Sequence, residues 1–308
     1  MSDAASVLII AGATASGKTE LAIELAREFD AEIVGADSRQ IYAGMPIGTA
    51  APSREQLAEV PHHLIGFLDP RQRYSAAQYA QDAIAALTEV RARGKRAIVA
   101  GGTGFYIRAL IGGVALAPQY DRSLRDRLAR EATLHPPEFL HAWLERHDAA
   151  RAAALGKNDT YRILRALEIA LAPCAVMRDT AVRTLASEGF TYRLVFLDVD
   201  WPTVDERIER RIVRMLDAGL VEEAERIGDG AVAASAVGYP QANAYLRGWS
   251  TPAELRASLA RATRRYARRQ RAWFRSEPAT LWLPPEALRS AIREKVGWSS
   301  KRGGPLWI

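Results

Sequence analysis

The sequence predicts an α/β fold, in which a parallel β-sheet is flanked by helices and interrupted by an all-helical insert. Apolar runs of strand length alternate with amphipathic helical segments in the first third of the chain, and the alternation returns after the insert. Residues 118–188 show only helical periodicity. We therefore expect a core domain over 1–117 and 189–298, with a loosely held tail over 299–308.

The first element that supports this fold is a phosphate-binding loop. Residues Gly12–Thr19 match the pattern Gly-x-x-x-x-Gly-Lys-[Ser/Thr] at each fixed position. Ser6–Ile10 is an apolar run typical of a buried strand, and Glu20–Glu28 has apolar residues at helical spacing. Backbone N–H groups in such a turn, together with a helix N-terminus, attract phosphate oxygens. We expect a P-loop NTPase-like fold and a polyphosphate held by Gly12, Ala13, Thr14, Ala15, Ser16, Gly17, Lys18 and Thr19.

Further strands and helices follow in chain order. Ala31–Gly35 is a second strand that leads to Asp37, and Ala97–Ala100 is a third that leads into Gly101–Gly104. Ser75–Arg93 is an amphipathic helix that begins with a serine cap. In the insert we expect helices over about 121–133, 136–146, 148–155 and 158–171. The core resumes with a strand over 192–198 and helices over 201–218 and 252–275.

Ligands of open parallel sheets bind at the carboxyl ends of the strands, so the phosphate loop, Asp37 and Gly101–Gly104 should face one cleft. Asp37 is the only carboxylate among them and is the candidate general base; a helix cap or a magnesium contact are its alternative roles. Thr19 can place its hydroxyl on a bound Mg²⁺. The third strand ends in glycines where many P-loop NTPases have a magnesium-binding Asp, which argues against a hydrolytic motor. Such glycines indicate that a bulky, flat group approaches the backbone closely.

Arginines are concentrated on two helices. Arg207, Arg211 and Arg214 share one helical face, and a diphosphate opposite them would offset their mutual repulsion. The alternative is a solvated face paired with Glu206 and Glu209. The last long helix carries a broader stripe, made of Arg261, Arg264, Arg265, Arg268, Arg269, Arg271 and Arg275.

The stripe on the last helix predicts contact with a nucleic acid. Acidic residues near it in the sequence are few, and a net charge of +6 with a pI of about 9.6 favours a polyanionic partner. We expect Arg264 and Arg268 to bind phosphates without reading sequence. The alternative is a basic face that is only solvated.

The cysteine content and the hydropathy indicate a compartment. A single cysteine, Cys174, excludes a disulfide within the chain and fits a reducing environment. The first strand begins without a signal segment before it, and no apolar stretch approaches the ~18 residues of a membrane span. We therefore expect a cytoplasmic protein that does not enter a membrane, and a monomer.

An ordered set of motifs resembles a known family. The phosphate loop is followed by Asp37-Ser-Arg-Gln-Ile-Tyr42, Gly101-Gly-Thr-Gly-Phe-Tyr106 and Arg165-Ala-Leu-Glu168. Val237-Gly-Tyr239 comes next, and the last helix contains Arg268-Arg-Gln270 and Trp273-Phe-Arg275. Over residues 7–282 the chain is similar to the bacterial tRNA dimethylallyltransferases, also called tRNA isopentenyltransferases. It departs from their pattern at Ala13, Ala51 and Pro240 and over 172–190.

The resemblance implies that a dimethylallyl group passes from dimethylallyl diphosphate to the exocyclic amine of the adenosine 3′ of the tRNA anticodon, with release of diphosphate. It implies that Asp37 takes a proton from the amine, that Thr14 and Arg211 stabilise the leaving diphosphate, and that Lys18 holds it with Mg²⁺. The insert is implied to bind the anticodon stem-loop. The implied tRNA contacts are Asp37, Ser38, Arg39, Gln40, Thr103, Arg125, Tyr161, Arg162, Ile163, Leu164, Arg165, Gly238 and Tyr239, beside Arg264 and Arg268 of the stripe.

Other functions would use the same phosphate loop. One is an isopentenyltransferase acting on free AMP or ADP, and another is a small-molecule P-loop kinase with Arg207 and Arg211 around the transferred phosphoryl group. The arginine stripe and the insert disfavour both, because a small acceptor needs neither. A non-catalytic RNA-binding protein is disfavoured by the intact Lys18, Thr19 and Asp37.

Overall fold

The computed structural model describes residues 6–112, 121–171, 183–277 and 280–298. The chain divides into two compact units, one made of residues 1–114 and 183–308 and the other of residues 115–182. The second unit therefore ends six residues before the boundary expected at 188. Leu185 explains the difference, because it is buried in the core of the first unit and its N–H donates to the carbonyl of Leu110 at 2.9 Å. The expected tail and Cys174 lie outside the described residues.

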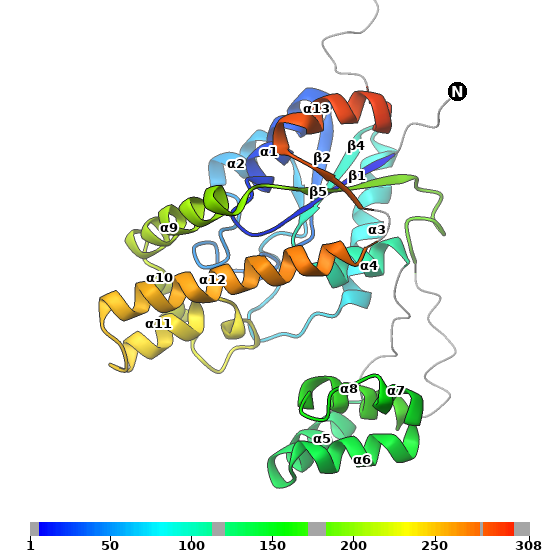
Figure 1. The fold of residues 1–308 in the computed structure, drawn as a ribbon. Helices are drawn as coiled ribbons and strands as arrows, with labels where there is room; N and C mark the ends of the chain where they lie inside the picture. The colour runs from blue at the N-terminus through cyan, green and yellow to red at the C-terminus, as the bar shows by residue number, and fades with distance from the viewer. Residues whose placement is uncertain (1–5, 113–120, 172–182, 278–279, 299–308) are drawn as a thin grey trace, which may run out of the picture. The chain divides into compact units, whose positions relative to one another are not determined.

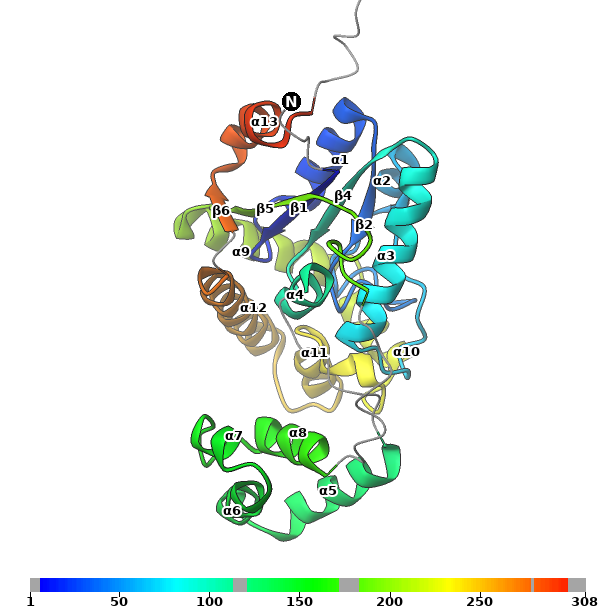
Figure 2. The ribbon, with the colours of Figure 1, turned by 90° about the vertical axis from the view of Figure 1, so that its right-hand side faces the viewer.

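The first unit is built on a six-stranded sheet in which all strands are parallel, in the order β3-β2-β4-β1-β5-β6 (Figure 2). The expected α/β fold is confirmed. Every residue of the central strand β1 is buried, as its unbroken apolar sequence requires of a strand covered on both faces. The strands are β1 Val7–Gly12, β2 Ala31–Gly35, β3 His62–His63, β4 Arg96–Gly101, β5 Tyr192–Leu197 and β6 Thr280–Leu283.

Helices cover both faces of this sheet (Figure 1). Because side chains alternate along a strand, Val7 and Ile9 pack on one face with α3, α4, α9 and α12, whereas Leu8 and Ile10 pack on the other with α1 and α13. The core helices are α1 Lys18–Phe29, α2 Arg54–Glu59, α3 Ala76–Ala92, α4 Gly104–Ile111, α9 Trp201–Asp217, α10 Leu220–Ile227, α11 Tyr239–Leu246, α12 Pro252–Arg275 and α13 Leu288–Ala291.

The helix starts follow the capping signals of the sequence. Ser75 begins α3 with a capping box, in which its hydroxyl accepts the N–H of Gln78 and the Gln78 side chain accepts the N–H of Ser75. Thr251 and Glu254 form the same arrangement at α12, where Pro252 takes the first helical position. The expected bounds of α3, α9 and α12 are confirmed to within one residue at each end.

The described residues of the second unit form helices joined by short turns and contain no strand. Its core contains Leu128, Leu140, Leu144 and Leu167, which come from three of its four helices. The helices are α5 Arg122–Leu134, α6 Pro137–His147, α7 Ala149–Ala153 and α8 Thr160–Ala170, each within three residues of the expected bounds.

Several elements were not expected from the sequence. β3 has only two residues and β6 only four, too few for hydrophobic periodicity to identify. α4 begins directly after Thr103, in a segment interpreted only as a glycine turn. None of the helices in the described part of the chain combines the length and apolarity that a bilayer crossing requires.

Candidate active site

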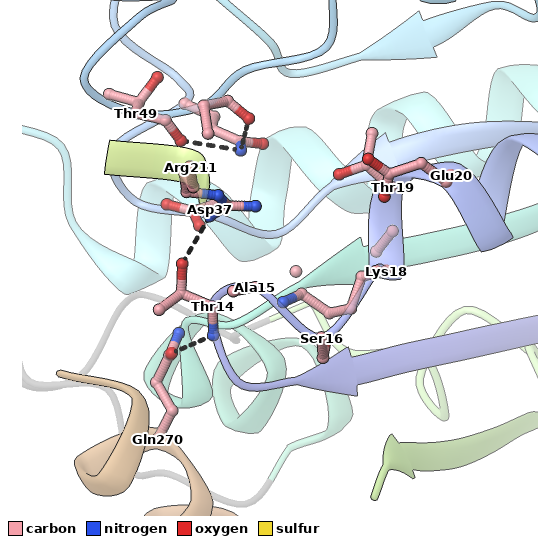
Figure 3. Close-up of a pocket in the computed structure, with 15 residues that line it drawn as sticks. Thr14, Ala15, Ser16, Lys18, Thr19, Glu20, Asp37, Thr49, Arg211 and Gln270 are labelled. Carbon is pink, nitrogen blue, oxygen red and sulfur yellow. Dashed lines mark hydrogen bonds between the residues drawn. The ribbon is translucent and has the colours of Figure 1, made fainter. Parts of the chain in front are cut away.

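A pocket lies at the carboxyl ends of β1, β2 and β4, as the topology of an open parallel sheet predicts (Figure 3). The phosphate loop forms one wall of this pocket, and α9 and α12 each contribute one side chain. Its lining residues are Thr14, Ala15, Ser16, Gly17, Lys18, Thr19, Glu20, Asp37, Gln40, Thr49, Ala50, Ala100, Gly101, Arg211 and Gln270.

The phosphate loop owes its shape to small residues. Gly17 has φ 87° and Ala15 has φ 65°, so the loop turns twice through the left-handed region before α1 begins. A side chain at Gly12 would collide with the hydroxyl of Ser16, which lies across the turn. The match to the pattern therefore corresponds to a closed turn at the N-terminus of a helix, the geometry that binds phosphate.

Lys18 is half-buried, and its ammonium turns back into the phosphate loop. Its Nζ donates to the carbonyl of Ala13 at 2.8 Å. Burial lowers the pKa of Lys18 from 10.5 to about 8, while the nearby carboxylate of Asp37 opposes this shift and the guanidinium of Arg211 adds to it. Lys18, Asp37 and Arg211 thus form one electrostatic group around the pocket.

Two arginines of α9 reach the phosphate loop. Arg211 donates from Nη1 to the hydroxyl of Thr14 at 2.8 Å, and Arg207 donates from Nη1 to the carbonyl of Ser16 at 3.0 Å. Burial lowers the pKa of Arg211, and the carboxylate of Glu20 is the main group that opposes this. Arg207, Arg211 and Arg214 were expected to share one face of this helix. Arg207 and Arg211 contact the phosphate loop, whereas Arg214 is exposed.

Asp37 follows β2 and lines the same pocket. Its Oδ1 accepts the N–H of Arg39 at 2.9 Å, so it closes a turn. The alternative role as a helix cap is wrong, because residues 38–41 form turns and no helix. Its role as a general base stays a prediction.

Polar residues of the neighbouring turns are tied to one another. The N–H of Ser38 donates to the hydroxyl of Thr103 at 2.9 Å, which joins the turns after β2 and β4. Gln40 donates from Nε2 to the carbonyls of Thr49 and Ala50 at 3.2 and 2.9 Å. Arg39 donates to the hydroxyl of Ser235 at 3.3 Å. Of these predicted tRNA contacts, Gln40 lines the pocket, and Ser38, Arg39 and Thr103 are hydrogen-bonded in the turns beside it.

The glycines after β4 serve packing within the chain. A side chain at Gly102 would overlap the amide of Gln270, and one at Gly104 would overlap the indole of Trp273. A side chain at Gly101 would overlap the backbone of Ala36. The bulky, flat group expected near these glycines is an indole of α12 at Gly104, and Gly102 makes room for an amide of the same helix. Neither makes room for a ligand, whereas Gly101 lines the pocket.

Gln270 lines the pocket, although the sequence motif that contains it indicated no role for this residue. It is 6% exposed, its Oε1 accepts the N–H of Thr14 at 2.8 Å, and its Nε2 donates to the carbonyl of Gly102 at 3.0 Å. The sequence feature that could have identified Gln270 is a neutral polar residue on the buried side of an arginine-rich helix.

The arginine stripe of α12 divides in two. Arg264 pairs with Asp205 and Glu209 of α9, and Arg271 pairs with Asp198. The expectation that Arg264 lacks acidic partners is corrected, because these acids come from a helix distant in sequence. Arg268 is exposed, with its guanidinium over the ring of Trp201 at 5.8 Å. The exposed arginine face consists of Arg261, Arg265, Arg268, Arg269 and Arg275.

Gly238 and Tyr239 do not present side chains to an RNA. Both are buried, and the hydroxyl of Tyr239 donates to Oε1 of Glu223 at 2.7 Å. Glu223 in turn accepts the N–H groups of Ile47 and Gly48 at 3.0 and 2.7 Å. The predicted contact through Tyr239 is corrected: its side chain fixes the chain next to Thr49, on the pocket wall.

The predicted contacts in the second unit differ in exposure. Tyr161 and Arg162 are exposed, and Arg162 pairs with Asp159 at 3.2 Å. Arg125 and Arg165 both pair with the buried carboxylate of Glu168, at 3.3 and 2.7 Å. Leu164 is partly buried against the core of this unit. Ile163 is fully buried, so a contact through its side chain is excluded and that prediction is corrected.

A metal would find few protein ligands here. No three His, Cys, Asp or Glu side chains gather as a metal site in the residues that the structure describes. Thr19 lines the pocket, so its hydroxyl and the oxygens of a bound diphosphate are the available donors. This oxygen set fits Mg²⁺, which takes few protein ligands and keeps several waters.

Comparisons with known proteins agree with this arrangement. A family model described as IPP transferase matches residues 40–277. A tRNA dimethylallyltransferase of Geobacter sulfurreducens is 41% identical over 285 residues, which cover 90% of this chain and 91% of that protein. One from an Anaeromyxobacter species is 42% identical over 283 residues, with 91% and 94% covered.

Solved structures extend the likeness to three dimensions. A tRNA isopentenylpyrophosphate transferase from Bacillus halodurans has a TM-score of 0.66 at 32% identity, with 94% of each chain covered. A eukaryotic dimethylallyltransferase acting on tRNA has a TM-score of 0.74 at 22% identity, with 96% of this chain and 80% of that one covered, which is a likeness of fold. The family model, the related sequences and the solved structures all point to the family that the motifs suggested. The chain belongs to the IPP transferase family.

Proposed function

We propose that this protein transfers the dimethylallyl group of dimethylallyl diphosphate to the exocyclic amine of the adenosine 3′ of the tRNA anticodon. The observation that carries the proposal is the composition of the pocket. Lys18, Thr14 and Arg211 gather at the phosphate loop, and Asp37, which follows β2, lines the same pocket. Groups that bind a leaving diphosphate therefore share one site with a carboxylate that can accept a proton.

The reaction follows from these positions. The amine nitrogen forms a bond to the first carbon of the dimethylallyl group while the bond from that carbon to the diphosphate oxygen breaks. The electron pair of the broken bond leaves with the diphosphate, whose charge is stabilised by Lys18, Arg211, the Thr14 hydroxyl and the N–H groups of the loop. The proton of the amine passes to Asp37. An amine on a stacked base is inaccessible, so the base must first leave the stack.

Mg²⁺ is part of the proposal. The hydroxyl of Thr19 and the diphosphate oxygens would hold it, and it would neutralise charge on the leaving group. We further propose that the enzyme is a monomer that acts in the cytoplasm. The exposed arginine face and the helices of the second unit would bind an RNA acceptor, whereas an acceptor such as AMP, ADP or a sugar would need neither.

A labelling experiment tests the acceptor. The protein is incubated with isotopically labelled dimethylallyl diphosphate and tRNA, AMP or ADP, and in parallel with ATP and sugars. We expect label in tRNA alone, and nuclease digestion should place it in the anticodon loop. A matched tRNA with inosine in place of that adenosine has a carbonyl where the amine was, and should stay unlabelled. Label in AMP or ADP, or phosphoryl transfer from ATP, would contradict the proposal.

A further inference from the structure

We infer that Gln270 is a positioning residue, which holds Thr14 where its hydroxyl and Arg211 together meet the leaving diphosphate. This inference rests on the proposed function and assigns a role within that site to a residue of the last long helix. The hydrogen bond that joins Gln270 to the phosphate loop comes from the main-chain N–H of Thr14, so we infer that Gln270 acts on the reaction through that residue.

The Gln270 amide is fixed at both ends. Its oxygen accepts the N–H of Thr14 at 2.8 Å, and its nitrogen donates to the carbonyl of Gly102 at 3.0 Å. The side chain is 6% exposed, so water does not compete effectively for these bonds. Gln270 therefore joins α12 to the turns after β1 and β4.

Thr14 is consequently held from two sides, as Figure 3 shows. Its N–H is bonded to Gln270 of α12, and its hydroxyl accepts a hydrogen bond from Arg211 of α9 at 2.8 Å. The room for this arrangement comes from Gly102, since any side chain there would displace the Gln270 amide. Loss of the main-chain bond would let Thr14 shift, and its hydroxyl and Arg211 would shift with it.

The test removes the two hydrogen bonds without removing the volume. Gln270→Met keeps the length of the side chain and cannot accept from Thr14 or donate to Gly102. We expect kcat to fall about 10- to 100-fold, the effect of a misplaced catalytic group, while the KM for tRNA changes less than about threefold. In a Thr14→Ala background, Gln270→Met should cost less than about threefold more, because the two changes affect the same group.

Thr263→Val is the matched control. Thr263 lies in the same helix, is buried, and donates from its hydroxyl to the carbonyl of Leu259 at 2.8 Å. Loss of this hydrogen bond in Thr263→Val should lower Tm about as much as Gln270→Met does, and should leave kcat unchanged. If the control lowers kcat as much, or if the effects of Gln270→Met and Thr14→Ala multiply in full, Gln270 is only structural and the inference is overturned.

Hydrogen exchange at the Thr14 amide gives a readout that does not depend on activity. We expect Gln270→Met to speed this exchange about tenfold or more, and Gln270→Glu, which keeps the acceptor, to leave it slow. Equal exchange in the wild type and Gln270→Met would overturn the inference. A wild-type enzyme that prenylates no tRNA would instead overturn the proposed function, and the exchange experiment would still decide the contact.

Discussion

Arg211 of α9 donates a hydrogen bond from its Nη1 to the hydroxyl of Thr14, 197 residues earlier in the chain, at 2.8 Å. The contact brings a half-buried cation to the phosphate loop beside Lys18, which lines the same pocket. A site in which two half-buried cations lie at one phosphate loop is suited to a ligand with several negative charges. The first prediction tests this contact.

Arg211→Gln should lower kcat about 10²- to 10³-fold, because it removes a donor aimed at charge that develops in the transition state. Arg214→Gln is the matched control, since Arg214 lies one turn further along α9 and is exposed. Single-turnover rates with saturating tRNA measure the effect. Equal rates for the two variants would show that Arg211 does not act on the leaving group.

Asp37→Asn should lower kcat about 10²- to 10⁴-fold, the usual effect of losing a general base, because an amide of the same shape cannot accept the proton. The affinity for tRNA should change less than about threefold, since the loss falls on the chemical step. Glu20→Gln removes the other carboxylate that lines the pocket and should lower kcat less than about tenfold. If kcat instead falls strongly in Glu20→Gln and only slightly in Asp37→Asn, the base is Glu20.

Lys18 should make diphosphate binding depend on pH. Its pKa in the folded protein is about 8, below its ordinary value of 10.5. Between pH 8 and pH 10.5 the unfolded chain binds more protons than the folded protein. The contribution of Lys18 to the free energy of unfolding therefore rises with pH, and Lys18→Met should abolish that rise.

Affinity for dimethylallyl diphosphate should fall above pH 8 by up to about tenfold per pH unit, because the ammonium of Lys18 loses its proton. Titrations of the wild type and Lys18→Met, compared at each pH, cancel the ionisation of the ligand.

The exposed arginine face of α12 should control the salt dependence of tRNA binding. Replacing Arg261, Arg265 and Arg269 together with Gln should reduce the slope of log affinity against log salt by about two units, because fewer counterions are released. Arg264→Gln should leave the slope unchanged and lower Tm, since Arg264 is paired with Asp205 and Glu209. Parallel lines for the triple variant and the wild type would mean that this face is only solvated.

The local elements could be predicted because their signals are contained in short segments. The phosphate loop needs only eight residues, and the capping residue Ser75 marks the start of a helix whose bounds the structure confirms. Asp37 could be placed near the loop because the parallel strands of one sheet end at the same edge. Each of these inferences depends on contacts between residues that are close in sequence or on a general rule of topology.

The failures involved partners that are distant in sequence. Arg264 looked unpaired because Asp205 and Glu209 are more than fifty residues away, and Tyr239 looked available because nothing nearby in the sequence announces Glu223. The glycines after β4 looked like a ligand site because Trp273 and Gln270 reach them only when α12 packs on the sheet.

The phosphate-binding loop, the parallel sheet and the arginine-rich last helix could be inferred from the residues alone, because they depend on local patterns of size, charge and periodicity. Which arginines reach Thr14 and Ser16, which are neutralised by acids and which remain exposed became clear only from the folded chain. A charge acts over a few ångströms in space, whatever its distance along the chain. Packing of α9 and α12 against the sheet sets those distances, and Arg211 and Gln270 acquire their places at the loop through it.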